Sequence, residues 1–378
     1  MTWRAKSATA LVIAVCTAAL IGCGDSTSPG SATLSDPPGL SSDVQSLGTP
    51  FQAPAFQSMS ALSAGSTPLA RTTGLLAALS PIRPASQPQG MSAKPALAVR
   101  ALRPSFATAP TGPGSLIPAT YWGHVFVWDA TSSQYIDGGA TGGPATGVRF
   151  TLYALNPLTG EPATPLNPIG WADLTDESTN TQFKLGVVVA DGTTTYADYV
   201  VSATTTASSL LADATGYITD GTHRLDFSNS ASVTASQVGL DYSLALNQPA
   251  VSAHLVATLA VGSTTSVLSA TFGVTRGSET VVLSGTLTAT QTQSGFTASA
   301  QFVITVNGGQ FATITGTAQS GSSASFTYVG PGRALTQAER DAVDRMFEAP
   351  GTLSTTVDGV FAPAEHLLGT STSLTVPG

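Results

Sequence analysis

The sequence predicts an all-β fold, a meander of long antiparallel strands with one short helix near its C-terminal end. The first observation is a period of two: from Phe183 onward, apolar residues alternate with Ser, Thr, Gln and Asp over long runs. Such alternation turns one face of a strand toward a core and the other toward water. The second observation is that short glycine-containing turns separate the runs, and turns this short join only antiparallel neighbours.

The first 22 residues predict an export signal. Arg4 and Lys6 precede an apolar run over residues 8–21, which is the order of charge and hydrophobicity in a signal peptide. The run is shorter than the ~20 apolar residues of a comfortable membrane span. An ordinary cleavable signal and an uncleaved anchor are the alternatives to a lipoprotein signal.

The end of this run, Leu20-Ile21-Gly22-Cys23, resembles the lipobox of bacterial lipoproteins. The resemblance implies that Cys23 becomes the acylated first residue of the mature chain and that the acyl chain attaches the protein to a membrane. Cys16 lies in the segment that would be removed, so Cys23 would be a lone cysteine, which cannot form an internal disulfide. Gly24 follows, whereas an aspartate there marks inner-membrane retention in well-studied lipoproteins; the expected destination is therefore the outer membrane.

Composition limits the partners. Charged residues make up 10% of the 378 residues, well below the ~25% of an average soluble protein. Removing Arg4 and Lys6 with the signal leaves 12 basic side chains against 22 acidic ones, a formal charge of −10. Because phosphate backbones are bound by clustered Lys and Arg, we expect no nucleic-acid partner. Membrane affinity would come from the acyl chain.

Residues 23–114 predict a lipidated N-terminus followed by a flexible tether. Residues 24–114 hold 13 of the 24 prolines and few aromatic side chains, so they offer little apolar area to offset the entropy of ordering. One short helix is expected around 69–79. The alternative is that part of this segment lies as an arm along the later sheet, as the apolar residues Leu97, Val99 and Leu102 suggest.

Residues 115–378 predict a β-rich domain that opens with an aromatic-rich part, 115–180. Aromatic and β-branched residues predict strands over 121–128, 148–153 and 169–174. Two glycine-rich motifs within 137–144 predict a loop between the first two strands.

The part over 181–330 predicts the meander. Its strands are longer than the usual ~5–6 residues. The clearest alternating runs are 238–246, 251–261, 268–274, 281–289 and 296–304, and the clearest turns are Asp220-Gly221, Arg276-Gly277-Ser278 and Asn307-Gly308-Gly309.

Residues 335–349 predict the helix. Thr336 and Glu339 have the spacing of a capping box, in which each side chain bonds the backbone N–H of the other residue. A last strand, 353–361, is expected to close an edge within the tail 353–378. An apolar stripe at helical spacing predicts that the helix packs on the apolar side of the sheet; its residues are Ala338, Ala342, Val343, Met346 and Phe347.

Two architectures suit this pattern best: a two-layer sandwich, or a curved half-barrel sheet with the helix on its apolar face. A transmembrane barrel also alternates, but the later strands lack its aromatic girdles. A β-solenoid would need a fixed repeat, which the sequence lacks.

The chain carries no recognisable catalytic or cofactor-binding motif. Its histidines, His124, His223, His254 and His366, lie far apart and lack metal-ligand spacing. No nucleophile elbow and no phosphate-binding loop occurs. We therefore predict no enzyme and no cofactor. His124 and His254 lie on predicted strands opposite the apolar positions, so we expect these two histidines to face solvent.

The acidic residues Asp173, Asp176 and Glu177 suggest a weak calcium hypothesis, with Asp137 as a further ligand, because calcium prefers oxygen donors. Their spacing differs from that of the twelve-residue calcium loop, and a solvated acidic turn is the simpler interpretation.

Two function classes remain. The first is a non-enzymatic envelope lipoprotein whose β domain binds an envelope protein, glycan or lipid through its hydroxyl-rich face. The second is a carrier or acceptor of a lipophilic ligand, which resembles in outline the periplasmic lipoprotein-localisation carriers and would need a sizeable apolar cavity. An enzyme of unrecognised type is third. Beyond the lipobox, the arrangement resembles uncharacterised β-rich envelope lipoproteins, from which no activity carries over.

Overall fold

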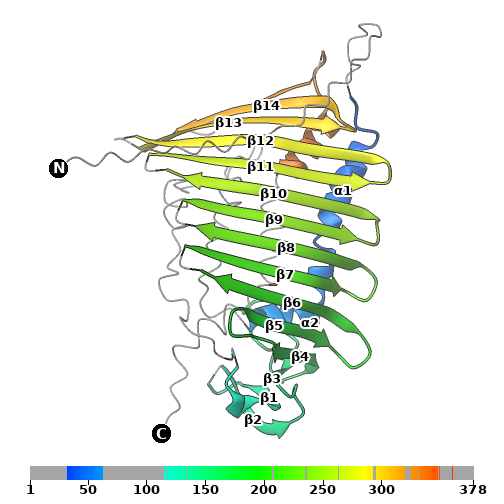
Figure 1. The fold of residues 1–378 in the computed structure, drawn as a ribbon. Coiled ribbons are helices and arrows are strands. Elements are labelled where there is room, and N and C mark those ends of the chain that lie inside the picture. Colours follow the sequence, from blue (N-terminus) through cyan, green and yellow to red (C-terminus); the bar gives the residue numbers. More distant parts are fainter. Residues whose placement is uncertain are drawn as a thin grey trace, which may run out of the picture. The chain divides into compact units, whose positions relative to one another are not determined.

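The strands form one open sheet of 15 strands (Figure 1). The computed structural model describes residues 32–62 and 115–347, with breaks at 116, 133, 207, 235, 263, 293–294, 320–324 and 331, and positions 349 and 360. The strands are β1 His124–Asp129, β2 Gln134–Thr141, β3 Gly147–Tyr153, β4 Pro168–Asp176, β5 Phe183–Ala190, β6 Thr195–Thr205, β7 Ser209–Thr219, β8 Arg224–Thr234, β9 Gln237–Leu246, β10 Val251–Val261, β11 Thr265–Arg276, β12 Glu279–Thr292, β13 Gly295–Val306, β14 Gly309–Gln319 and β15 Ser325–Val329.

The order of the strands confirms the predicted meander. From β4 to β14 each strand pairs antiparallel with the strands before and after it in the sequence. β3 pairs with β4 and, in parallel, with β1, so that β2 lies at the edge of the sheet; among the described strands, β1 and β3 are the only parallel pair. On β9 and β10, buried and exposed residues alternate as the period of two predicts. The strands lie in a single sheet, so the sandwich of two separate sheets does not form.

The predicted turns also form. Asn307 and Gly308 both have positive φ, 50° and 79°, which is the requirement of a two-residue type I′ hairpin, and Asn-Gly is the pair that adopts it most readily. This turn joins β13 to β14. Gly277 and Gly221, at positive φ, serve the turns β11–β12 and β7–β8.

An N-terminal helical segment packs on the sheet, and this corrects the predicted tether. It consists of α1 Pro37–Ser46, the short 3-10 helix η1 Thr49–Gln52 and α2 Pro54–Ala61. α1 contacts β11, η1 contacts β7 and α2 contacts β3 to β6, so this part of 23–114 is ordered and runs across the strands (Figure 1).

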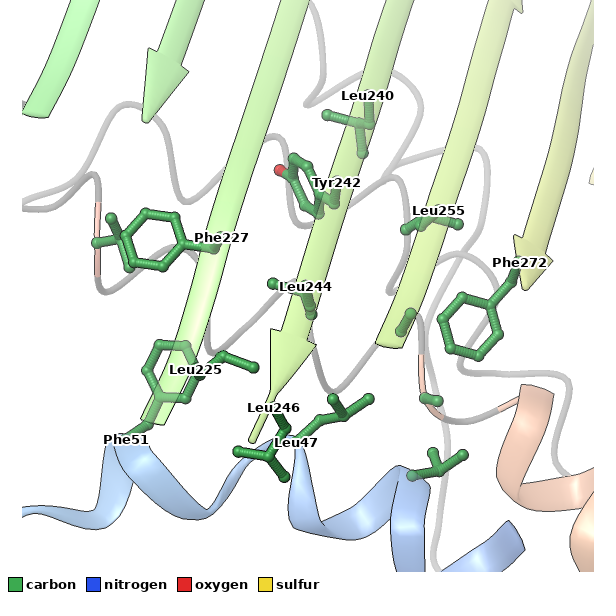
Figure 2. Close-up of a cluster of buried hydrophobic side chains, with 14 of the residues drawn as sticks. Leu47, Phe51, Leu225, Phe227, Leu240, Tyr242, Leu244, Leu246, Leu255 and Phe272 are labelled. Atoms are coloured by element: carbon green, nitrogen blue, oxygen red, sulfur yellow. The ribbon is translucent and has the colours of Figure 1, made fainter. Parts of the chain in front are cut away.

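Two of the prolines that suggested a tether instead begin helices. Pro37 and Pro54 open α1 and α2, where the first turn needs no N–H and φ near −65° suits a helix. The Asp36 side chain accepts a hydrogen bond from the Gly39 N–H at 3.1 Å and caps α1. The segment lacks a core of its own, but its apolar stripe completes the core of the sheet. Figure 2 shows Leu47 and Phe51 beside Leu225 and Leu246.

One cation ties this segment to a distant hairpin. Arg276, at the end of β11, lies within 3.2 Å of Asp36, 3.5 Å of Asp43 and 3.5 Å of Glu279. Its side chain is only 16% exposed. Glu279 also accepts a hydrogen bond from the Ser35 backbone at 2.7 Å. The start of α1 is therefore held to the β11–β12 turn by charge as well as by apolar contact.

The C-terminal helix spans 337–347 and confirms the predicted cap. The Thr336 N–H donates to Glu339 Oε2 at 2.8 Å, and the Glu339 N–H donates to Thr336 Oγ1 at 3.3 Å. The predicted stripe is buried except Ala338, which is exposed. The Phe347 ring meets the Phe302 ring edge-on at 5.2 Å, so the helix covers the apolar face near β13.

The aromatic-rich part differs from its prediction at one strand. Residues 137–141, expected in a loop, belong to β2 and pair with β1. The pairing register shifts between Val125 and Phe126, opposite Gly138 and Gly139. Gly139 has a φ of 68°, so the glycines form a bulge within the strand rather than ending it.

Several predictions concern residues outside the described part. These are the lipobox with Cys23, the helix around 69–79, the apolar residues Leu97, Val99 and Leu102, and His366. Most of the predicted closing strand 353–361 also lies outside it, but Val360, its one described position, is helical and buried rather than extended. No helix of the described residues is long and apolar enough to cross a membrane.

Candidate binding face

The candidate site is the outward face of β11–β15, which we call the hydroxyl face. Its side chains alternate with buried ones and point away from the helices. Its described positions are Thr265, Val267, Ser269, Thr271, Gly273, Thr275, Thr280, Val282, Ser284, Thr286, Thr288, Thr290, Thr297, Ser299, Gln301, Val303, Thr305, Gln310, Thr313, Thr315, Thr317, Gln319, Ser325, Thr327 and Val329.

These positions carry no charge, although the chain has 14 basic and 22 acidic residues. The charged residues of β11 and β12, Arg276 and Glu279, lie at the β11–β12 turn and face the helical segment. On the outward faces of β8 and β9 charges do occur, as in Asp226 and Asp241. The loss of charge is thus confined to the last strands of the sheet.

Strand pairing arranges the hydroxyls in rows. Ser299 pairs with Thr288 on one side and with Thr317 on the other, and Thr317 pairs with Ser325. A second row, one step along the strands, contains Thr286, Gln301, Thr315 and Thr327. Neighbours in a row are about 4.8 Å apart, and the rows are about 6.7 Å apart. The strands therefore present a regular lattice of donors and acceptors.

The hydroxyl face is hollowed over β12–β15. A shallow depression of about 460 Å³ is lined by both rows. An adjoining depression of about 530 Å³ shares the row of Thr288, Ser299, Thr317 and Ser325 and reaches Thr290 and Thr297. The two form one hollow across four strands and three rows.

The hydroxyls of the hollow are available to a ligand. In the described part of the chain, the side chains of Thr286, Thr288, Thr315 and Thr317 make no hydrogen bond to another residue, whereas Thr265 and Thr290, nearer the rim, lie 3.4 Å apart. Each threonine hydroxyl can donate one hydrogen bond and accept two. The hollow can therefore exchange many hydrogen bonds with a neutral polar ligand.

The structure does not bring the proposed calcium ligands together. Asp173 makes a bidentate pair with Arg149, at 2.7 Å for both bonds, and Glu177 pairs with Lys184 at 2.6 Å. Asp176 accepts hydrogen bonds from Ser115, from the Ile117 N–H and from the Ser178 N–H. Burial raises the pKa of Asp176, but these hydrogen bonds outweigh it and lower the pKa overall. Each carboxylate already has a partner in the protein.

Asp137, the further ligand of that hypothesis, is likewise engaged. Its carboxylate lies 2.7 Å from His124 Nδ1. The hydrogen bond from the Gly139 N–H is the main cause that lowers the pKa of Asp137, and the hydrogen bond with His124 lowers this pKa further. Among the described residues, no three His, Cys, Asp or Glu side chains are placed to hold a metal ion.

The described histidines each pair with one aspartate. His223 lies 2.7 Å from Asp220 in the β7–β8 turn, and His254 lies 2.9 Å from Asp241 across β9 and β10. The His254 and Asp241 side chains are more than half exposed, as predicted for a solvent-facing histidine. No nucleophile from the described part of the chain joins either pair.

The inner face contains one polar side chain that sequence reasoning missed. Asn229, on β8, is 2% exposed, and neither of its amide atoms has a hydrogen-bond partner among the residues that the structure describes. Its neighbours across the strands are Ala214 and Tyr242. The sequence does contain a signal for this residue. Asn229 follows Leu225 and Phe227 at every second position of an alternating run, so it lies on the same, buried side of the strand.

The hollow was also missed, although its hydroxyl-rich face was predicted. The signal was a local one: threonine at every second position over 286–290 and 313–317, with no charge between. The chain matches no protein-family model, no curated protein and no solved structure.

Proposed function

We propose that this chain is a lipid-anchored, non-enzymatic envelope lipoprotein whose sheet binds an envelope component through the hydroxyl face. The observation that carries the proposal is the difference between the two faces of the sheet. The inner face is buried by the chain's own residues, among them Leu47 and Phe347. The hydroxyl face of β12–β15 is open, uncharged and hollowed.

The anchor part of the proposal rests on Leu20-Ile21-Gly22-Cys23. Acylation of Cys23 would attach the protein to a membrane of the cell envelope, and Gly24, in place of an aspartate, favours the outer membrane. Labelled palmitate should enter the full chain, and Cys23→Ala should abolish the label. Palmitate in the Cys23→Ala chain would contradict the anchor.

The binding part is tested by cosedimentation with purified envelope fragments. The chain is exported through a cleavable signal that lacks the lipobox, so that no acyl anchor contributes. We expect it to sediment with the fragments, and Thr288→Lys, which places a long charged side chain in the hollow, to release it. Thr271→Lys on the same face, outside the hollow, is the matched control. Equal sedimentation of both variants would contradict binding through the hollow.

A lipophilic-ligand carrier is the second candidate, and one observation favours it. The Asn229 amide, which has no partner in the described part of the chain, lies on the apolar inner face, where it would bond the polar group of a bound lipid. Burying such an amide without a partner is costly. Native mass spectrometry of detergent-free protein tests this: mass that organic extraction removes, and that Asn229→Leu reduces, would support the carrier, whereas a clean mass would reject it.

A further inference from the structure

We infer that the hollow on the hydroxyl face is a binding site for an uncharged polysaccharide. This inference rests on the proposed function and names the ligand class of the same site. It follows from three properties of the hollow: the chemistry of its side chains, their repetition and the absence of charge.

The chemistry of the lining excludes strongly anionic or cationic ligands as its natural occupants. An anion would be met by Lys or Arg, and a cation by Asp or Glu, because an ion in a depression needs opposite charge to offset its desolvation. The lining instead consists of hydroxyls and two primary amides, Gln301 and Gln319, beside small residues such as Ala300. Neutral donors and acceptors of this kind match the hydroxyls of a sugar.

The repetition of the lining favours a polymer over a single sugar. The hydrogen bonds available to each threonine, such as Thr315 or Thr317, contribute little beyond the bonds to water that they replace. No aromatic side chain lies on the described hydroxyl face for a sugar ring to stack on. Useful affinity must therefore come from many equivalent contacts, which a repeating ligand makes at once along a repeating surface.

The concave shape of the hollow distinguishes this ligand from a flat partner. A flat protein surface would not follow the depression over Thr288, Ser299 and Thr317, which has a volume of about 460 Å³. A chain of sugar residues can lie in the depression and present hydroxyls to its floor. The site is open along its length, so the ends of a long polymer need not be accommodated.

The test is affinity electrophoresis of the full chain in native gels that contain a soluble polysaccharide. The neutral probes are dextran, pullulan and laminarin, and alginate is the anionic comparison. We expect at least one neutral polymer to retard the protein, equally at low and high salt, and alginate to have no effect. Insensitivity to salt is expected because no ionic contact is involved.

The decisive variant is the double substitution Thr315→Val with Thr317→Val. It removes two hydroxyls from the hollow and keeps side-chain shape and strand preference. We expect about tenfold weaker retardation, the change for two lost hydrogen bonds. The matched control, Thr271→Val with Thr305→Val, removes two hydroxyls from the same face outside the hollow and should bind like the unaltered chain. Thr288→Lys provides a second, independent block of the hollow.

Three results would overturn the inference: no retardation by any neutral polymer, retardation by alginate that high salt abolishes, or equal retardation of the two double variants. If no polymer binds while Thr288→Lys still releases the chain from envelope fragments, the proposed function stands and only the ligand class is wrong. If Thr288→Lys changes neither the retardation by polysaccharide nor the sedimentation with envelope fragments, both the inference and the proposed binding through the hollow are wrong.

Discussion

The two faces of the sheet are built from the same strands yet differ in almost every property. On β11, Phe272 is 1% exposed among Leu255 and Leu283, while its chain neighbour Thr271 faces water. The inner face is varied in shape, since Gly285 leaves room for the Phe302 ring. The hydroxyl face is uniform. The comparison suggests that stability depends on the inner face and recognition on the hydroxyl face.

The largest expected effect is on the inner face. Phe272→Ala should lower the free energy of unfolding by about 3–5 kcal/mol, because it removes a buried ring and leaves a cavity. Thr271→Val, one residue away on the hydroxyl face, should change it by less than about 0.5 kcal/mol. Urea denaturation measures both. Similar losses in the free energy of unfolding from the two substitutions would contradict the conclusion that stability depends on the inner face.

The next effect concerns the attachment of the helical segment. Arg276→Met leaves Asp36, Asp43 and Glu279 together without their cation. We expect the free energy of unfolding to fall by about 2–3 kcal/mol. This is less than the ~3–5 kcal/mol for breaking a fully buried ion pair, because Asp36 is exposed. The chain should also become more sensitive to proteolysis within 32–62.

The control is Arg224→Met. Arg224 pairs with Asp226, and both side chains are about half exposed, so the loss should stay below about 1 kcal/mol. If Arg276→Met and Arg224→Met cost the same, the ion cluster does not hold α1 to the sheet.

A gain in stability is expected at Asn229. Asn229→Leu removes two unpartnered polar atoms from the inner face and should raise the free energy of unfolding by about 1–2 kcal/mol. Thermal and urea unfolding check the direction. Ser228→Ala, at an outward-facing position of the same strand, should leave stability nearly unchanged. A destabilised Asn229→Leu chain would mean that the amide has a partner in solution.

The smallest effect is at the cap of the C-terminal helix, which covers the inner face near β13. Thr336→Ala removes half of the capping box and should cost about 1 kcal/mol in urea denaturation. Gln337→Ala is the control, because Gln337 is the next residue along the chain, is exposed and takes no part in the capping box. It should cost less than Thr336→Ala, and equal costs would mean that the capping box does not stabilise the helix.

The same cap predicts a pH dependence. The hydrogen bond from Arg333 is the main cause that lowers the pKa of Glu339 to about 2 from its usual 4.5. A carboxyl whose pKa is lower in the folded than in the unfolded chain stabilises the fold at any pH above its unfolded-state pKa. This contribution is therefore present above pH 4.5 and is lost as the pH falls toward 2. The difference in stability between the unaltered chain and Glu339→Gln should shrink over that range. A constant difference would contradict the pairing.

The sequence predicted the later strands well because their inner and outward faces differ in polarity at every step. Val238 to Leu246 and Val251 to Val261 have this pattern, and the structure places β9 and β10 there. The period of two is a local signal and needs no knowledge of the partner.

The errors arose where the structure depends on contacts distant in sequence. Nothing near Leu40 or Phe51 indicates that a sheet formed from residues far along the chain will cover them, so the segment looked too poor in apolar area to order. The bulge in β2 likewise depends on pairing with β1. The hollow is a property of four strands together, and a list of threonines does not reveal its depth.

The nearest-neighbour order of the meander also has a consequence for how the chain folds and evolves. Because each strand from β4 onward pairs with the strand just before it in the sequence, contact order within the meander is low, which favours rapid formation. A chain that emerges with its N-terminal end first can add strands one at a time, in the manner of a quasi-one-dimensional repeat protein. Duplication or loss of one hairpin would widen or narrow the sheet while preserving the direction of every later strand.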